Sequence, residues 1–112
     1  MATVPTIEPK LQTATESTEA TFRRLATNWK NAVAFLSSSR QRESHADYLE
    51  IIGLGPAVVP YLLRDLEENE THWFTALHRI TGAAPVAEAD AGNIPRMREA
   101  WLHWARTNGY QW

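Results

Sequence analysis

Four histidines are the side chains in this sequence most able to bind a metal ion, because neutral imidazole is a common zinc ligand. They are His45, His72, His78 and His103. Helical zinc sites place two ligands four residues apart on one face, and no pair of these histidines has that spacing. The chain has no cysteine, which excludes thiolate ligands, thiolate nucleophiles and disulfides. We therefore expect neither a metal site nor a cofactor.

Hydroxyl and carboxylate side chains offer little basis for catalysis. Three consecutive serines, Ser37–Ser39, lie where a helix is expected to end, and no neighbouring base is predictable. Asp47 and Glu50 form one pair of acids, at a helix cap, and Glu67 and Glu68 form another, at a solvated helix end. Acid–base catalysis needs carboxylates in a cleft that shifts their pKa values, and nothing in the sequence indicates a cleft. The sequence predicts no catalytic residues and a protein that is not an enzyme.

His72 and Trp73 are the first candidates for binding a partner. They follow an acidic run and open a predicted helix, where free backbone amides attract anions. This arrangement would make them an exposed recognition corner. The alternative, which we favour, is that Trp73 packs in the core while His72 is solvated.

The last predicted helix carries a second candidate, a basic face made of Arg96, Arg98, His103 and Arg106. Such a face could bind phosphate or an acidic partner. It could also be an ordinary solvated surface, since cations near a helix C-terminus are favourable. The net charge is −2, whereas a duplex-binding domain usually has a strong basic bias. Nucleic acid is therefore the alternative partner and not the leading one.

The chain contains five tryptophans, a residue type used both in cores and at binding hot spots. Trp101 and Trp104 share a helical stripe with Met97, so we expect them in the core. Tyr110 and Trp112 differ, because they lie past the point where the last helix is expected to end. They either fold back onto the protein or dock on a partner or a second copy of the chain.

Helices must position these side chains, since apolar residues recur at steps of three and four and no strand-like alternation occurs. Five helices are predicted. The residues expected to begin or end them are Ser17, Ser37–Ser39, Ser44, Gly53, Gly55, Pro56, Thr71, Gly82, Asn93 and Gly109. Residues 1–16 lack an apolar period and are interpreted as a flexible tail before a helical domain at residues 17–112.

Some helices carry more specific expectations. The first is expected to continue to Leu36, the last residue of its apolar stripe. Ser44 followed by Asp47 resembles a capping box for the second. Pro60 lies inside the third, where we expect a kink in preference to a helix that begins near Val59. The aromatic residues expected in the core are Phe22, Trp29, Trp73 or Phe74, Trp101 and Trp104.

The segment at residues 51–63, IIGLGPAVVPYLL, resembles a HEAT-type helical repeat. In that family one helix ends at Leu-Gly, and its partner begins with Ala-Val-Pro followed by a Leu-Leu pair. The chain from His45 to Tyr110 is also similar to a group of short bacterial proteins of unknown function. They share a His-Trp-Phe helix and a Met-x-x-Ala-Trp-Leu-x-Trp segment, here Met97–Trp104. The resemblance implies a scaffold for protein binding.

This chain departs from the HEAT pattern because it holds at most one full helix pair, whereas a solenoid needs about three repeats. We therefore expect an all-α fold: a single compact bundle of about five helices, with a HEAT-like pair in the middle and the outer helices acting as caps. The expected function is a non-enzymatic protein-interaction module or small regulator, which binds a protein partner or itself. The alternative is a nucleic-acid-associated or antitoxin-like factor that uses the basic face.

The sequence also carries expectations about location. No apolar run approaches the roughly 18 residues of a membrane span, so no membrane contact is expected. The first twelve residues lack the apolar segment of a secretory signal. We expect a soluble, cytoplasmic protein.

Overall fold

The computed structural model describes residues 16–112, and within that range the chain forms six α-helices, two 3₁₀-helices and no strand. The elements are α2 (Thr18–Ala32), α3 (Ser39–Glu43), α4 (Ala46–Gly53), η1 (Gly55–Val58), α5 (Val59–Asn69), α6 (Phe74–Thr81), η2 (Glu88–Asp90) and α7 (Ile94–Thr107). The predicted all-α bundle is confirmed. The predicted tail falls on residues outside the described ones, apart from Glu16, whose carboxylate accepts a hydrogen bond from the Thr21 hydroxyl at 3.0 Å.

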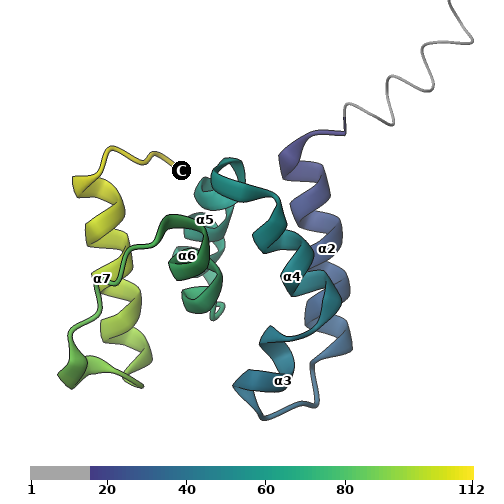
Figure 1. Cartoon of the computed structure of the whole chain (residues 1–112), viewed down its shortest axis with the longest axis horizontal. Coiled ribbons are helices and arrows are strands. Elements are labelled where there is room, and N and C mark those ends of the chain that lie inside the picture. The colour runs from purple at the N-terminus through teal and green to yellow at the C-terminus, as the bar shows by residue number, and fades with distance from the viewer. Residues whose placement is uncertain (1–15) are drawn as a thin grey trace, which may run out of the picture.

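The helices are arranged with α5 and α6 in the middle of the molecule (Figure 1). On one side α2 packs along α4, and α4 also contacts α6. On the other side α7 packs against α5. The helices α2 and α7 therefore form the two ends of the bundle, the positions expected for the first and last predicted helices.

An aromatic cluster around Trp73 forms the centre of the core. Three other rings surround it, with centroid distances of 4.8 Å for Trp29, 5.5 Å for Tyr48 and 5.6 Å for Phe22. These residues come from α2, α4 and the residue before α6, so the cluster joins segments far apart in the sequence. Tilted and stacked ring pairs of this kind add about 0.5–1.5 kcal/mol each beyond the area they bury. The predicted burial of Phe22, Trp29 and Trp73 is confirmed.

Trp101 begins a second aromatic group at the other end of the bundle. It is buried, as predicted, and Trp104 meets it edge-on at 5.5 Å. Trp104 itself is half-buried and lies between Trp101 and Tyr110, whose ring centroid is 5.4 Å away. Phe74 is also only half-buried, so Trp73 is the member of that pair that fills the core.

The polar atoms of the three polar rings in the Trp73 cluster, those of Trp29, Tyr48 and Trp73, each have a partner. The Tyr48 hydroxyl oxygen accepts a hydrogen bond from the Ala76 amide at 2.9 Å, and burial raises the pKa of this hydroxyl. The Trp29 indole N–H donates to the Arg42 carbonyl at 2.7 Å. Among the described residues, every buried side-chain nitrogen and oxygen is hydrogen-bonded. These bonds fix the rings in one orientation, because a buried donor without an acceptor is costly.

The first helix is shorter than predicted. α2 starts after Ser17, whose side chain accepts from the Ala20 amide at 3.0 Å, but it ends at Ala32 and not at Leu36. A turn closed by the Leu36 amide and the Val33 carbonyl follows at 2.9 Å. The serines then begin a short additional helix, α3, because the Ser38 side chain accepts from the Gln41 amide at 3.4 Å. The sequence pattern did not predict this helix.

The start of α4 also differs by one residue. His45 and not Ser44 caps the helix, since its Nδ1 accepts from the Asp47 amide at 3.1 Å. Ser44 ends α3, and its hydroxyl donates to the Gln41 carbonyl at 3.2 Å. The predicted capping box was wrong because Ser44 keeps a helical backbone at the end of α3, whereas His45 has the extended backbone of an N-cap.

Pro60 does not kink a helix. α5 begins at Val59, so the proline occupies its first turn, where a missing N–H has no helical acceptor to lose. Gly55 has a positive φ of 75° and ends α4 cleanly. The chain then passes through η1, and the axis turns by 108° between α4 and the η1–α5 segment. The expected kink was wrong, and the other interpretation of Pro60, a helix start, is correct.

Of the last two helices, α7 starts at its predicted cap, whereas α6 does not. Thr71 does not cap α6, which begins at Phe74 with no side-chain cap. Gly82, at φ 74°, ends that helix as predicted. Asn93 caps α7 by accepting from the Arg96 amide at 3.2 Å.

Within residues 16–112, no single helix has both the length and the apolar character of a membrane span, although α4 and the η1–α5 segment meet that criterion jointly as a bent pair.

Candidate functional site

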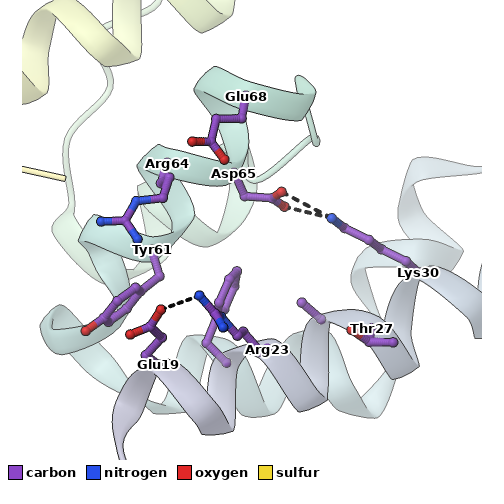
Figure 2. Close-up of a pocket in the computed structure, with 10 residues that line it drawn as sticks. Glu19, Arg23, Thr27, Lys30, Tyr61, Arg64, Asp65 and Glu68 are labelled. Atoms are coloured by element: carbon purple, nitrogen blue, oxygen red, sulfur yellow. Dashed lines mark hydrogen bonds and ion pairs between the residues drawn. The ribbon is translucent and has the colours of Figure 1, made fainter.

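A surface pocket of about 280 Å³ lies between α2 and α5 (Figure 2). Phe22 and Tyr61 form its aromatic side, with ring centroids 6.3 Å apart. Two ion pairs lie along it: Glu19 with Arg23 at 2.6 Å on α2, and Lys30 with Asp65 at 3.0 Å between the two helices. Its lining carries three basic side chains, Arg23, Lys30 and Arg64, and three acidic ones, Glu19, Asp65 and Glu68.

Asp65 is the most tightly held polar group of this pocket, with a side chain that is 12% exposed. It accepts hydrogen bonds from Asn69 at 2.6 Å, from the Trp73 indole at 2.7 Å and from Lys30 at 3.2 Å. Burial alone would raise its pKa, but the hydrogen bonds from Asn69, Trp73 and Lys30 outweigh it and hold the pKa below its usual value. Asp65 is therefore an ionised structural acceptor and a poor general base.

The sequence pattern did not reveal this role, because Asp65 stands at the start of the acidic stretch that ends the helix. The available signal was its spacing: it stands three residues after Leu62, at the edge of the apolar stripe of α5. The Lys30–Asp65 ion pair ties α2 to α5. Because the acidic and basic side chains of the pocket are equal in number, it presents no net charge to a ligand.

Trp73 is not part of an exposed corner. It is 0% exposed, and its indole N–H is bonded to Asp65, so it cannot contact a partner in the folded chain. His72 beside it is half-buried, and its ring lies 5.7 Å from that of Phe74. The interpretation of Trp73 as a core residue is correct, and only His72 of this pair is accessible.

His72 lines a shallow pocket of about 290 Å³ together with the end of α2 and the turn after it, including Val33, Ala34 and Arg42. The next residue along this turn is Phe35, which is 100% exposed. We call Ala34, Phe35, Arg42 and His72 the docking corner. The sequence pattern did not identify Phe35 as a candidate binding residue. It placed Phe35 on the outer face of a continuing helix, where single exposed apolar residues are common.

The arginines of the basic face are engaged inside the protein. Arg98 is 25% exposed, and its guanidinium donates to the Leu66 carbonyl at 3.3 Å and the Glu67 carbonyl at 2.7 Å. These carbonyls belong to the last turn of α5, where the Leu66 carbonyl also accepts from the Glu70 amide at 3.0 Å, so Arg98 adds a cationic cap to that helix from α7. Arg98 is therefore engaged within the chain, with a quarter of its side chain left exposed.

The remaining residues of this face are more open. Arg106 pairs with the Glu67 carboxylate at 3.0 Å, and Arg96 lies 3.7 Å from Asp90. His103 is exposed. Each arginine of the face thus has an acidic neighbour, which lowers the positive potential that a phosphate would meet.

The chain end folds back onto the bundle. Its turn is closed by the Tyr110 amide, which donates to the Ala105 carbonyl at 2.9 Å. The Trp112 indole N–H donates to Glu67 at 2.8 Å, and the Arg106 guanidinium lies 5.3 Å from the centroid of the Trp112 ring. Of the two interpretations left open for Tyr110 and Trp112, the structure shows docking on the chain's own helices.

The structure brings few of the candidate ligands together. Within residues 16–112, no three His, Asp or Glu side chains are grouped as metal ligands would be. No family model matches this chain, and the searches of curated proteins and of solved structures give no match.

Proposed function

We propose that this protein is a non-enzymatic protein-interaction module that binds a protein partner through the docking corner. The observation that carries the proposal is the complete exposure of Phe35. A phenylalanine that moves from water into an interface contributes about 1.5–3 kcal/mol to binding. Interfaces also draw most of their affinity from a few residues of this kind, which makes Phe35 the natural anchor.

The backbone beside Phe35 is held by hydrogen bonds to the rest of the fold. The Leu36 carbonyl accepts from the Arg42 guanidinium at 3.3 Å, and the Arg42 carbonyl accepts from the buried Trp29 indole at 2.7 Å. Phe35 is thus connected to the aromatic core through two hydrogen bonds. A turn whose backbone is already ordered loses less conformational entropy when it binds, which favours recognition.

The resemblance to HEAT-type repeats and to short bacterial proteins supports the same proposal, and with it a small regulator that acts in a bacterial cytoplasm. The alternative, a nucleic-acid-associated or antitoxin-like factor that uses the basic face, has weaker support. Arg98 is committed to the end of α5, and Arg96 and Arg106 each face a carboxylate. Nucleic-acid affinity depends on cations that are available to phosphates.

The proposal predicts that Phe35→Ser abolishes the capture of a partner from cells that make the protein. The tagged chain would be cross-linked in the cell, purified and analysed by mass spectrometry. Leu49→Ser is the matched control, because Leu49 is the other large apolar side chain with substantial exposure among the described residues, at 43%. A partner lost with Phe35→Ser and kept with Leu49→Ser is expected. Equal capture by both variants would contradict the role of Phe35.

A further inference from the structure

Glu70, beside the docking corner, has a strained backbone. It lies in the left-handed region, at φ 53° and ψ 31°, and caps the C-terminal end of α5. Its amide donates to the Leu66 carbonyl at 3.0 Å, so the helix is closed in the usual way. In this region the Cβ of an ordinary residue crowds the neighbouring carbonyl, whereas glycine adopts the conformation freely.

Elsewhere the described chain uses glycine for this conformation. Within residues 16–112, the other positions with a positive φ are Gly55, Gly82, Gly92 and Gly109. Gly82 ends α6 in the same left-handed region that Glu70 occupies at the end of α5. A glutamate in place of glycine therefore makes the end of α5 less stable than the fold allows.

The charge of Glu70 is a second cost to the fold. The C-terminal end of a helix carries a partial negative charge, which favours cations and repels carboxylates. Glu67 and Glu68 stand in the last turn of the same helix and add like charges. Glu70 is exposed, and within residues 16–112 it has no ion-pair partner. Neither the backbone nor the charge of Glu70 therefore stabilises the protein.

Glu70 lines the pocket of about 290 Å³ that belongs to the docking corner. Ala34, Arg42 and His72 line the same pocket, and Phe35 follows Ala34 in the chain. A partner that is seated on the docking corner therefore meets Glu70 as well.

The other charged side chains that line this pocket are engaged within the chain. Lys30 pairs with Asp65 at 3.0 Å. Arg42 is half-buried, and its guanidinium donates to the Leu36 carbonyl at 3.3 Å. Two further charged residues of α3 do not line the pocket, Arg40 and Glu43. Among the described residues, Glu70 is thus the exposed and unpaired charge of this pocket.

We propose that Glu70 is a specificity residue of the docking corner, which binds a lysine or arginine side chain of the partner protein. The partner then carries a basic side chain beside the apolar one that covers Phe35. A hydrogen bond between a cation and a carboxylate is among the stronger polar contacts, and strained residues are typical of binding sites. The inference rests on the proposed function, since it names the chemistry of the partner that the docking corner binds.

Urea unfolding of the full chain tests whether Glu70 serves the fold. Glu70→Gly should lower the unfolding equilibrium constant about threefold, because glycine adopts the left-handed conformation without strain. Glu70→Gln keeps the strain and removes the charge, so its change should be smaller. A Glu70→Gly variant that is no more stable than the wild type would overturn the inference.

Binding to the partner tests the role of the carboxylate. The protein that the wild type captures and Phe35→Ser loses would be identified, purified and titrated by calorimetry with the full chain and its variants. Glu70→Gln and Glu70→Gly should each bind about tenfold more weakly, as expected for the loss of a charged hydrogen bond. Raised salt should weaken binding of the wild type more than that of Glu70→Gln.

Glu68→Gln is the matched control, because Glu68 is an exposed glutamate of the same helix that does not line this pocket. It should bind like the wild type. A Glu70→Gln variant that binds as tightly as the wild type would overturn the inference and leave the role of Phe35 standing. A wild type that captures no partner would overturn both proposals.

Discussion

Trp73→Ala is expected to lower the free energy of unfolding by about 3–5 kcal/mol, which is the usual loss when a large buried aromatic side chain is truncated. Trp73 is 0% exposed and contacts three aromatic rings, so the neighbours cannot close the cavity without moving. A domain of this size has a total stability of about 5–15 kcal/mol, so this single truncation should remove a large fraction of it. Urea unfolding followed by far-UV circular dichroism measures the loss.

Trp73→Phe separates the packing of the ring from its hydrogen bond. Phenylalanine keeps an aromatic ring in the cluster but cannot donate to Asp65. The expected loss is smaller, about 1–3 kcal/mol, because a charged acceptor then lacks one of its donors. A Trp73→Ala variant that unfolds at the wild-type urea concentration would show that the core is not centred on this residue.

Asp65→Ala is expected to produce the second largest loss, about 2–3 kcal/mol at neutral pH, because the buried Trp73 N–H is left without an acceptor. The effect should depend on pH. The folded-state pKa of Asp65 lies below its ordinary value of 3.8, so the ionised carboxylate stabilises the fold fully above about pH 4. That contribution disappears as the pH falls through the folded-state pKa. Urea unfolding from pH 7 down to acid conditions measures the difference between the two proteins.

Glu68→Ala is the matched control for Asp65→Ala. Glu68 lines the same pocket from the same helix, but it is exposed. Its replacement should change the unfolding free energy little, as exposed charges usually contribute little. The gap between the wild type and Asp65→Ala should narrow at acid pH. A gap that stays constant over the whole range would mean that the charge of Asp65 contributes nothing to stability.

Periodicity predicted burial better than it predicted helix ends. Val33 and Leu36 stood on the predicted stripe, and Val33 is buried while Leu36 packs against the core. The helix nevertheless ends at Ala32, and a turn places these side chains where another helical turn would have placed them. A spacing of three or four residues fits both geometries, so the pattern alone could not reveal that Phe35 stands on a turn.

The candidate sites were harder to predict, because their outcome depends on contacts distant in sequence. Arg98 looked like a surface cation, and nothing near it indicated that its acceptors lie 31 and 32 residues earlier in the chain. Glu67 likewise gave no sign that it would bind Trp112, 45 residues later. Local spacing identifies which residues are polar and which share a face, but it does not identify the partner across the bundle.

Fluorine NMR of the chain labelled with 4-fluorophenylalanine tests the role of Phe35 most directly. The protein has three phenylalanines, Phe22, Phe35 and Phe74, so three resonances are expected. When extract of the native cell is added, the Phe35 resonance should shift and broaden. The resonance of the buried Phe22 should stay in place. A Phe35 resonance that remains sharp and unshifted at every concentration, and also when extract of the native cell is added, would contradict the assignment of Phe35 as a binding anchor.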